Sequence, residues 1–397
     1  MNTNLRPRLK VLSPTVLRLG LVSFFADVSS EMLYPITPIF LSTVLGASML
    51  SVGVVEGVAE SIASLLKTYS GAYSDRLRRR RPFIVTGYAL AAIAKPIIGF
   101  ATGWSLVLFA RGLDRTGKGI RTAPRDALLS DSVSPEVQGE AFGWHRLMDT
   151  FGAAIGPLFA ILFLSRNPAD LRPLYFWALV PGIVSVAIAA SVREAPRTST
   201  TKPERPRAWR WRDTNPGFRT YLFAWAIFSL VNSSDVFLIL KAKSAGASLR
   251  TTILMYCFYS LFYALSSPYL GRLSDRMKRR NLLIVGLAIF TAVYLGFAVA
   301  SAAWQFWVLF AVYGLYMGCT DGVGKALVVD LVPTEFKGTA IGMLGTVSGI
   351  AILGASAIGG LLWDRIGPAA TFVYGAAGAS IAIALLASVP GRGRSRT

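Results

Sequence analysis

The chain has 397 residues, of which 53% are hydrophobic and only 16% are charged, and its mean hydropathy is +0.51. Soluble domains carry about 25% charged residues, so this composition excludes an ordinary soluble protein and indicates one embedded in a membrane. The formal net charge is +20, but the basic residues occur in short runs between apolar segments rather than in one patch. This distribution argues against a nucleic-acid partner.

A membrane-spanning helix needs about 20 predominantly apolar residues. Twelve windows meet that length, and we expect one transmembrane helix in each: 15–44, 48–74, 82–101, 104–128, 138–164, 171–192, 217–242, 248–274, 281–301, 303–328, 338–363 and 367–389. The fourth window is the least apolar. The sequence therefore predicts an all-α membrane protein with twelve transmembrane helices.

Runs of Lys and Arg alternate along the chain with uncharged connections. The basic segments are the N-terminus, 76–82, 193–219, 276–280 and the C-terminus, whereas the connections near 44–48 and 101–104 carry no charge. Because Lys and Arg accumulate in cytoplasmic loops, both termini are expected in the cytoplasm. We expect a multi-pass protein of the inner (cytoplasmic) membrane of a bacterium or archaeon.

One long polar segment divides the chain into similar halves. A linker at 193–216, rich in Pro, Thr and Arg, separates an N-terminal six-helix bundle (1–192) from a C-terminal one (217–397). Short sequences recur in both halves: GAYSDRLRRR (71–80) and GRLSDRMKRR (271–280), DSVSPEVQGEAFG (131–143) and DLVPTEFKGTAIG (330–342), GAS at 46–48 and 246–248, and SSE (29–31) and SSD (233–235). Two repeated six-helix halves are typical of one large transporter architecture.

The repeated decapeptide carries a recognisable motif, G-x-x-x-D-R-x-x-R-R, between the second and third helices of each half. It is met by Gly71, Asp75, Arg76, Arg79 and Arg80, and again by Gly271, Asp275, Arg276, Arg279 and Arg280. On these motifs and the twelve-helix pattern, the chain resembles the major facilitator superfamily, in particular its proton-coupled drug and metabolite antiporters. The resemblance implies two rocking six-helix bundles and a central cavity lined by helices 1 and 4, with helix 2 beside them.

Ionisable residues at bilayer depth are costly and mark candidate functional positions. Asp27 lies twelve residues into the first window, about 18 Å deep at 1.5 Å per residue, near the centre of the bilayer. Helices 2, 4 and 7 also carry charges. The predicted proton-coupling and substrate cavity comprises Asp27, Glu31, Glu56, Glu60, Lys67, Arg111, Asp114, Arg115, Lys118 and Asp235.

Two interpretations of these charges remain open. They could take up and release a proton while the arginines contact the substrate, or they could form static salt bridges that position helices. The repeat is a control, because Glu56, Glu60 and Lys67 correspond at an offset of 200 to Tyr256, Ser260 and Ser267. Packing alone therefore does not demand charge there, and the N-terminal half is the specialised one.

The resemblance adds two motifs. Arg111 is similar to the helix 4 arginine that the superfamily uses in proton transfer, although Asp114 and Arg115 stand where Gln and Gly are usual. The fifth helix resembles the G-x-x-x-G-P motif of antiporters through Gly152, Gly156 and Pro157. Close helix packing alone is an equally good explanation of that motif.

The repeated decapeptide also predicts a cytoplasmic gate. Its two parts are Gly71, Asp75, Arg76 and Asp131, and Gly271, Asp275, Arg276 and Asp330. We expect the glycines to allow tight packing, Asp75 and Asp275 to cap helices of the opposite half, and the two arginines to pair with Asp131 and Asp330.

The function predicted from the sequence is secondary active transport of a small organic, amphipathic solute by alternating access, as proton-coupled efflux. The alternatives are a proton-coupled symporter that imports an organic anion or nutrient, and a lipid-translocating or receptor-like protein without proton coupling. We expect no enzymatic activity, cofactor or metal, since Cys257 and Cys319 lie in apolar segments and no phosphate-binding P-loop is present. The expected partners are a small-molecule substrate, protons and the lipid bilayer, and the protein is expected to be a monomer.

Overall fold

A computed structural model describes residues 13–77, 79–134, 138–166, 170–194, 214–333 and 336–388. Within this part of the chain the regular secondary structure is helical. The chain divides into two compact units, Met1–Ala47 with Val58–Ser199, and Ser48–Gly57 with Thr200–Thr397. The linker expected at 193–216 falls largely outside the described residues.

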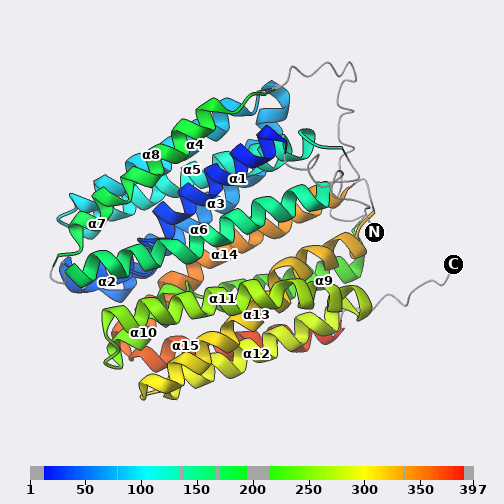
Figure 1. Cartoon of the computed structure of the whole chain (residues 1–397). Coiled ribbons are helices and arrows are strands. Elements are labelled where there is room, and N and C mark those ends of the chain that lie inside the picture. The colour runs from blue at the N-terminus through cyan, green and yellow to red at the C-terminus, as the bar shows by residue number, and fades with distance from the viewer. Residues whose placement is uncertain are drawn as a thin grey trace, which may run out of the picture. The chain divides into compact units, whose positions relative to one another are not determined.

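In the first unit the long helices run alongside one another (Figure 1). α1 packs against α6 and α8, while α4 packs against α5, α7 and α8. The elements are α1 (Pro14–Glu31), α2 (Thr37–Ile39), the π-helical η2 (Phe40–Val44), most of α3 (Met49–Leu77), α4 (Arg81–Gly99), α5 (Trp104–Asp131), α6 (Gln138–Arg166), α7 (Arg172–Trp177) and α8 (Leu179–Ser191).

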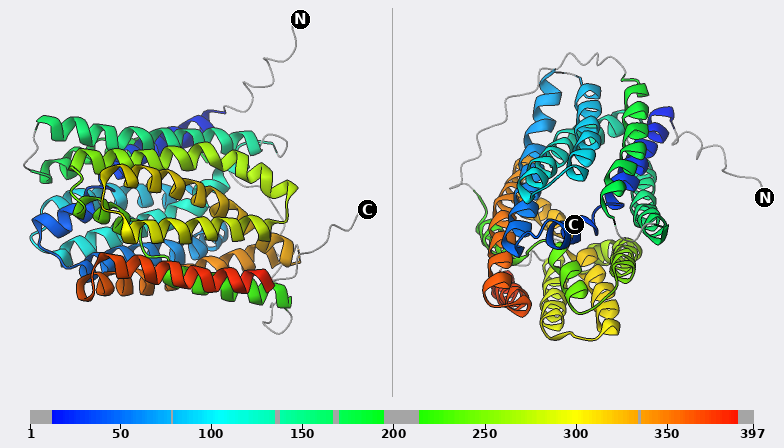
Figure 2. Two further views of the ribbon diagram at one scale, coloured as in Figure 1. Left: turned by 90° about the horizontal axis from the view of Figure 1, so that it is seen from below. Right: turned by 90° about the vertical axis from the view of Figure 1, so that its left-hand side faces the viewer.

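The second unit repeats these pairings. α9 packs against α14 and α15, and α12 packs against α13 and α15 (Figure 2). Its elements are α9 (Pro216–Val231), α10 (Val236–Ser244), α11 (Leu249–Arg276), α12 (Arg279–Val299), α13 (Ala303–Leu331), α14 (Lys337–Arg365) and α15 (Pro368–Ser388). The first turns of α3, residues 49–57, belong to this unit.

The two GAS sequences start equivalent helices. Gly46 and Gly246 have φ angles of 61° and 89°, a region that glycine adopts without steric cost. The serine two residues later caps the next helix: Ser48 Oγ accepts from Ser51 N and Ser248 Oγ accepts from Thr251 N, both at 3.1 Å. The sequence repeat thus corresponds to a repeated helix start.

The structure corrects three predicted helices. The window 15–44 is interrupted after Glu31, before the prolines at 35 and 38, which cannot donate helical hydrogen bonds. The window 217–242 is interrupted over residues 232–235, and 171–192 is divided at Ala178.

By length and composition alone, ten helical segments in the described part of the chain could cross a membrane. The predicted spans 15–44 and 104–128 are not among them. α5, which fills the second of these windows, has the composition of a buried charged helix rather than a lipid-facing one.

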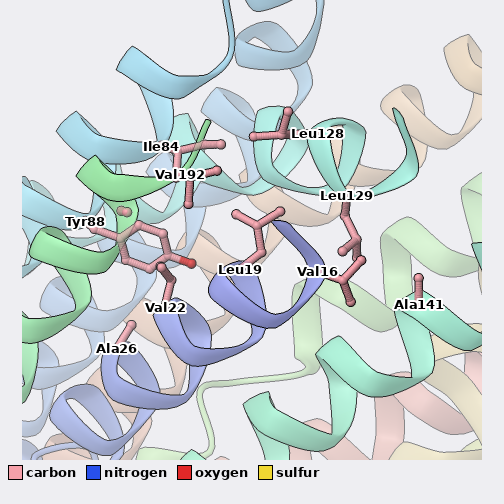
Figure 3. Close-up of a cluster of buried hydrophobic side chains, with 11 residues drawn as sticks. Val16, Leu19, Val22, Ala26, Ile84, Tyr88, Leu128, Leu129, Ala141 and Val192 are labelled. Atoms are coloured by element: carbon pink, nitrogen blue, oxygen red, sulfur yellow. The ribbon is translucent and has the colours of Figure 1, made fainter. Parts of the chain in front are cut away.

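A hydrophobic cluster holds one end of the first unit together. Val16, Leu19 and Val22 of α1 contact buried side chains of neighbouring helices, among them Ile84 and Leu128 (Figure 3). Burying a side chain of this size stabilises the fold by about 1.5–3 kcal/mol. Beyond this cluster toward the middle of α1, the core changes from apolar to charged.

Candidate functional site

Helix α5 carries a stripe of charge into the core of the first unit. Arg111, Asp114, Arg115 and Lys118 occupy positions i, i+3, i+4 and i+7, so they lie close to one face of the helix. Arg111 and Arg115 are only 8% and 7% exposed, whereas Lys118 is exposed. Asp114 Oδ2 lies 3.8 Å from Arg111 Nη1 and 3.9 Å from Arg115 Nε. One carboxylate is therefore shared between two buried guanidinium groups.

A salt bridge joins this stripe to α3. Arg115 Nη2 lies 3.2 Å from Glu60 Oε1. The two helices approach closely because Gly119 faces α3; a Cβ at this position would lie 2.6 Å from Leu66 Cβ. The structure thus brings together four of the predicted cavity residues, namely Glu60, Arg111, Asp114 and Arg115. Lys67, further along α3, is exposed.

Two carboxyl groups meet between α1 and α6. The carboxyl groups of Asp27 and Asp149 lie close enough to interact electrostatically. The helices come close at this level because Gly152 has no side chain; a Cβ there would lie 3.1 Å from Asp27 Cβ. Two ionised carboxylates this close would repel each other, and a proton shared between them would remove that repulsion.

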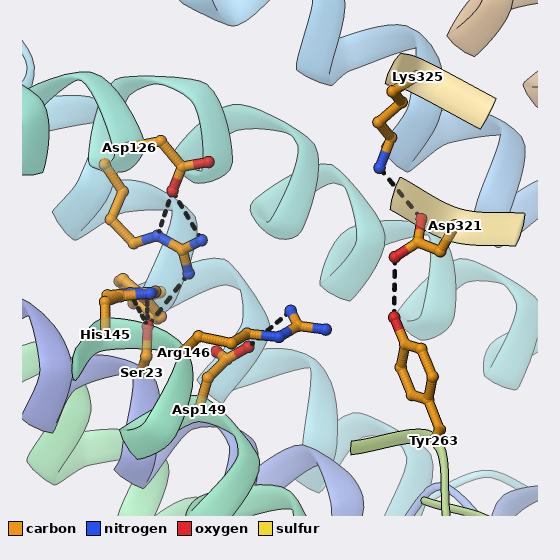
Figure 4. Close-up of polar contacts among 10 residues, drawn as sticks. Ser23, Asp126, His145, Arg146, Asp149, Tyr263, Asp321 and Lys325 are labelled. Atoms are coloured by element: carbon orange, nitrogen blue, oxygen red, sulfur yellow. Dashed lines mark hydrogen bonds and ion pairs between the residues drawn. The ribbon is translucent and has the colours of Figure 1, made fainter. Parts of the chain in front are cut away.

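Next to this pair, Ser23 of α1 is the centre of a buried polar network (Figure 4). Its Oγ lies 2.8 Å from His145 Nε2 and 3.3 Å from Tyr88 Oη, and it accepts a hydrogen bond of 3.1 Å from Arg125 Nη1. Arg125 also forms a salt bridge of 2.8 Å with Asp126. Arg125 and His145 both interact electrostatically with Asp149, so the network and the carboxyl pair form one system.

Two further buried cations lie between α4 and α5. Lys95 is 5% exposed, and its electrostatic neighbours include Asp114, Asp27 and Arg121. Arg121 is 7% exposed and stacks on the ring of Tyr88, with its Cζ 4.2 Å from the ring centroid. Within the described residues, Arg121 Nη1 is buried without a hydrogen-bond partner. This region therefore has positive charge that protein groups only partly compensate.

Three other predicted cavity residues have different surroundings. Glu31 is the last residue of α1 and is an electrostatic neighbour of Asp27. Glu56 is 1% exposed and belongs, with the first turns of α3, to the second unit. Asp235 also belongs to the second unit, where it accepts hydrogen bonds from Tyr313 and Tyr259. The charges predicted as one cavity are thus distributed over both units.

The glycines of the helix 5 motif lie in α6 and face α1. A Cβ on Gly152 would lie 2.4 Å from the Phe24 carbonyl oxygen, and one on Gly156 would lie 2.8 Å from Met32 N. Pro157 is inside α6. Both glycines therefore serve close packing of α6 on α1, at the level of Asp27.

The predicted gate is described only in part. The side chains of Asp75, Arg76 and Asp275 lie outside the described residues. Asp131 pairs with Arg80 at 2.5 Å and Asp330 with Arg279 at 2.6 Å, so an arginine later in each motif also contacts these carboxylates. The predicted pairing of Asp131 with Arg76 lies outside the described side chains.

The glycines of this predicted gate also differ from each other. A Cβ on Gly71 would lie 3.1 Å from Ala123 Cβ, whereas one on Gly271 would have no atom of the described residues within 4 Å. Among these residues, the tight packing expected at both glycines is found at Gly71 and not at Gly271.

Sequence reasoning missed Lys95, Arg121, Arg125 and Asp149. The rule that selected the other residues, charge inside an apolar window, also applies to Lys95 and Asp149, which lie in the windows 82–101 and 138–164. It applies to Arg121 and Arg125 as well. Their significance came only from their partners, since nothing in the order of residues places Asp149 beside Asp27.

The assembled site can hold and move a proton, and it can hold anionic groups. The carboxyl pair between α1 and α6 is able to share a proton, and its electrostatic neighbours include the cations Lys118 and Arg125 of α5. In the described part of the chain, no group of three or more His, Cys, Asp or Glu side chains has the arrangement of a metal site.

A family model for the Major Facilitator Superfamily matches residues 19–242 and again residues 220–397. An uncharacterized transporter of the same type from Methanocaldococcus jannaschii is 36% identical over 383 residues, 94% of each chain. An uncharacterized protein of Mycobacterium tuberculosis is 28% identical over 355 residues, 87% of this chain and 85% of that one. A multidrug resistance protein, MdtG of Salmonella arizonae, is 38% identical over 152 residues, 36% of this chain and 35% of its own.

Solved structures show the same fold at low identity. The nucleoside transporter NupG has a TM-score of 0.74 at 12% identity and covers 95% of this chain and 98% of its own. The human organic anion transporter MFSD10 has a TM-score of 0.65 at 15% identity, over 94% and 98%. At such identities the likeness concerns the fold alone.

Proposed function

Since the chain belongs to the major facilitator superfamily and is a multi-pass membrane transporter, we propose a specific form of transport for it. In this proposal the protein couples export of a small organic, amphipathic solute to proton entry. The observation that carries the proposal is the close pair of carboxyl groups, Asp27 and Asp149, between α1 and α6. A proton held between two helices of a transporter is placed where its loss changes how those helices pack.

Loss of the shared proton would leave two negative charges side by side. At about 4 Å and an effective dielectric constant of 20, two unit charges repel by about 4 kcal/mol. The basic groups near the pair, Arg125 and Lys118, are placed to compensate one of these charges. Proton release is thereby coupled to a rearrangement of α1 against α5 and α6, which is the element that an alternating-access cycle needs.

The direction of transport rests on two weaker observations. A third of the chain is similar to a multidrug resistance protein, and the glycine–proline motif of α6 resembles that of antiporters. The basic loops place both termini in the cytoplasm of an inner membrane by the positive-inside rule. We propose a monomer as the working unit.

A second candidate is proton-coupled symport of an organic anion. It is favoured by Lys95 and Arg121, which are buried close to each other, and by the absence of a partner for Arg121 Nη1 among the described residues. A carboxylate of the solute would satisfy such a guanidinium group well.

The direction in which protons move relative to the solute distinguishes antiport from symport. Purified protein is reconstituted into liposomes that contain a pH-sensitive dye and one compound of a panel of amphipathic amines and organic anions. The liposomes are then diluted into compound-free buffer, so that the compound moves outward. Antiport draws protons in and acidifies the lumen, whereas symport carries protons out and makes the lumen alkaline.

The control for this assay is the double variant Asp27→Asn/Asp149→Asn. It should release the compound without a pH change. Outward movement of a compound through the wild-type protein with no proton movement in either direction would refute proton coupling.

A further inference from the structure

The interruption between α9 and α10 is a polar segment inside an apolar span. An 18-residue window within residues 216–244 has a mean hydropathy of 1.7, yet the helix is broken in the middle of this segment, at Asn232, Ser233 and Ser234, with Asp235 in a turn. Ser356 supports the unwound backbone, because its Oγ accepts a hydrogen bond of 3.2 Å from Ser234 N. Unwound backbone at membrane depth is tolerated where it is buried in protein or lines a site.

Two tyrosines orient the carboxylate of this segment. Tyr313 donates a hydrogen bond of 2.7 Å to Asp235 Oδ1, and Tyr259 donates one of 3.3 Å to Oδ2. These residues come from α13 and α11, and both are buried. The two hydroxyl groups fix the direction of the carboxylate, and a carboxylate oxygen is able to accept from or bind more than one partner.

Two other side-chain oxygen atoms of the segment, Asn232 Oδ1 and Ser233 Oγ, are buried without a hydrogen bond of ordinary geometry among the described residues, although the Tyr294 hydroxyl is a neighbour of Ser233. Ser233 is only 2% exposed. The amide nitrogen of Asn232 lies 3.5 Å from Tyr316 Oη, one turn of α13 from Tyr313, so Asn232 and Asp235 face the same helix. An unsatisfied polar atom in an apolar interior costs about 1–3 kcal/mol, which a bound ligand would recover.

We propose that the oxygen atoms of Asn232, Ser233 and Asp235 at the interruption between α9 and α10 bind a sodium ion. The side-chain ligands are all oxygen, the donor type that hard cations prefer. The C-terminal end of α9 carries the negative end of its helix dipole and adds to the attraction. Interrupted transmembrane helices bind sodium in this way, through unwound backbone and helix ends.

The charge of the site selects a monovalent ion. One carboxylate balances one positive charge, whereas divalent cations in proteins are usually held by several carboxylates. The proposal is independent of the proton-coupled function, because the site lies in the second unit and the Asp27–Asp149 pair lies in the first. Its test therefore uses binding and not transport.

The experiment measures sodium binding to the purified full-length protein. Radioactive sodium is equilibrated with the protein, and thermal unfolding is followed while NaCl replaces choline chloride at constant ionic strength. We expect saturable binding of one ion per chain and a rise of Tm with the sodium concentration. Potassium and choline should produce neither effect at the same concentrations.

Three variants locate the ion. Asp235→Asn should abolish saturable binding, Asn232→Ala should weaken it, and Tyr259→Phe, which removes one hydroxyl that orients the carboxylate, should weaken it by about tenfold. The matched control is Asp321→Asn, which removes an exposed acid of the same unit that pairs with Lys325 and should leave binding unchanged.

Absence of sodium-specific binding to the wild-type protein would overturn the proposal, and so would unchanged binding in Asn232→Ala and Tyr259→Phe together. These two variants decide the matter if Asp235→Asn does not fold. Stabilisation by acid in place of sodium would instead identify Asp235 as a proton site.

Discussion

The substitution Asp27→Asn should remove the exchangeable proton of the Asp27–Asp149 pair and keep the packing of α1 against α6. Asparagine has nearly the same shape as aspartic acid, and its amide can donate a hydrogen bond to the carboxylate of Asp149. The contact between α1 and α6 is therefore retained, and we expect the free energy of unfolding to change by less than about 1 kcal/mol. The exchangeable proton of the pair is lost.

The expected effect on transport follows from the number of protons that the pair holds. One carboxyl pair carries one proton per cycle, and a pH difference of one unit supplies about 1.4 kcal/mol for each proton. This free energy supports about a tenfold ratio of an uncharged solute across the membrane. With Asp27→Asn the ratio at which net flux stops should fall to about one, the value for uncoupled transport, because no proton contributes.

The assay finds the solute ratio at which net flux through proteoliposomes is zero, with the pH difference fixed at one unit and the membrane potential set to zero. Asp149→Asn should give the same result as Asp27→Asn, because both variants remove the shared proton. The matched control is Asp170→Asn, an exposed residue of the same unit, which should behave like the wild type. A tenfold ratio maintained by both Asp27→Asn and Asp149→Asn would refute the assignment of the proton to this pair.

Three further predictions test individual contacts. Gly152→Ala places a Cβ 2.4 Å from the Phe24 carbonyl oxygen and should reduce the free energy of unfolding, measured by denaturant titration, by about 1–3 kcal/mol. The control is Gly103→Ala, where a Cβ has no neighbour within 4 Å among the described residues, and it should have little effect. Equal effects of the two variants would contradict the packing argument. Asp364→Ala removes the carboxylate that accepts hydrogen bonds of 3.0 and 2.8 Å from the first two N–H groups of α3. Loss of this cap should reduce the free energy of unfolding by about 1 kcal/mol and lower Tm. Asp364→Asn should recover part of the loss. Arg121→Met replaces a buried guanidinium group that lacks one hydrogen-bond partner among the described residues, and the free energy of unfolding should stay within about 1 kcal/mol of the wild-type value. If the solute is an organic anion, this variant should lose its transport. Unchanged anion flux would argue against a role for Arg121.

The sequence predicted much of the charged site because an ionisable residue inside an apolar window is conspicuous by itself. Asp27, Glu60, Arg111 and Arg115 were selected in this way, and Glu60 and Arg115 form a salt bridge of 3.2 Å. The sequence could not predict that Glu56, one turn before Glu60, belongs to the other compact unit. Helical periodicity places two residues on one face but does not say which helix that face meets.

The pairing of Asp27 with Asp149 was decided only by tertiary structure. The two residues are far apart in the chain, and their meeting depends on Gly152, whose missing side chain lets α6 approach α1. Sequence reasoning considered the glycine as part of a motif and overlooked the aspartate one turn before it. Likewise Arg121 gains its significance from Tyr88 of the neighbouring helix.

The sequence by itself determined the class of protein, the family and the positions of most helices, because these depend on hydrophobic length, charge in loops and repeated motifs, which are local properties of the chain. Only the tertiary structure decided where the helices are interrupted and which charges meet. The interruption at 232–235 is invisible to a hydropathy window, since a 29-residue span remains apolar on average. Contacts from other helices hold this segment in place: Ser356 accepts a hydrogen bond from its backbone, and Tyr259 and Tyr313 donate hydrogen bonds to its carboxylate.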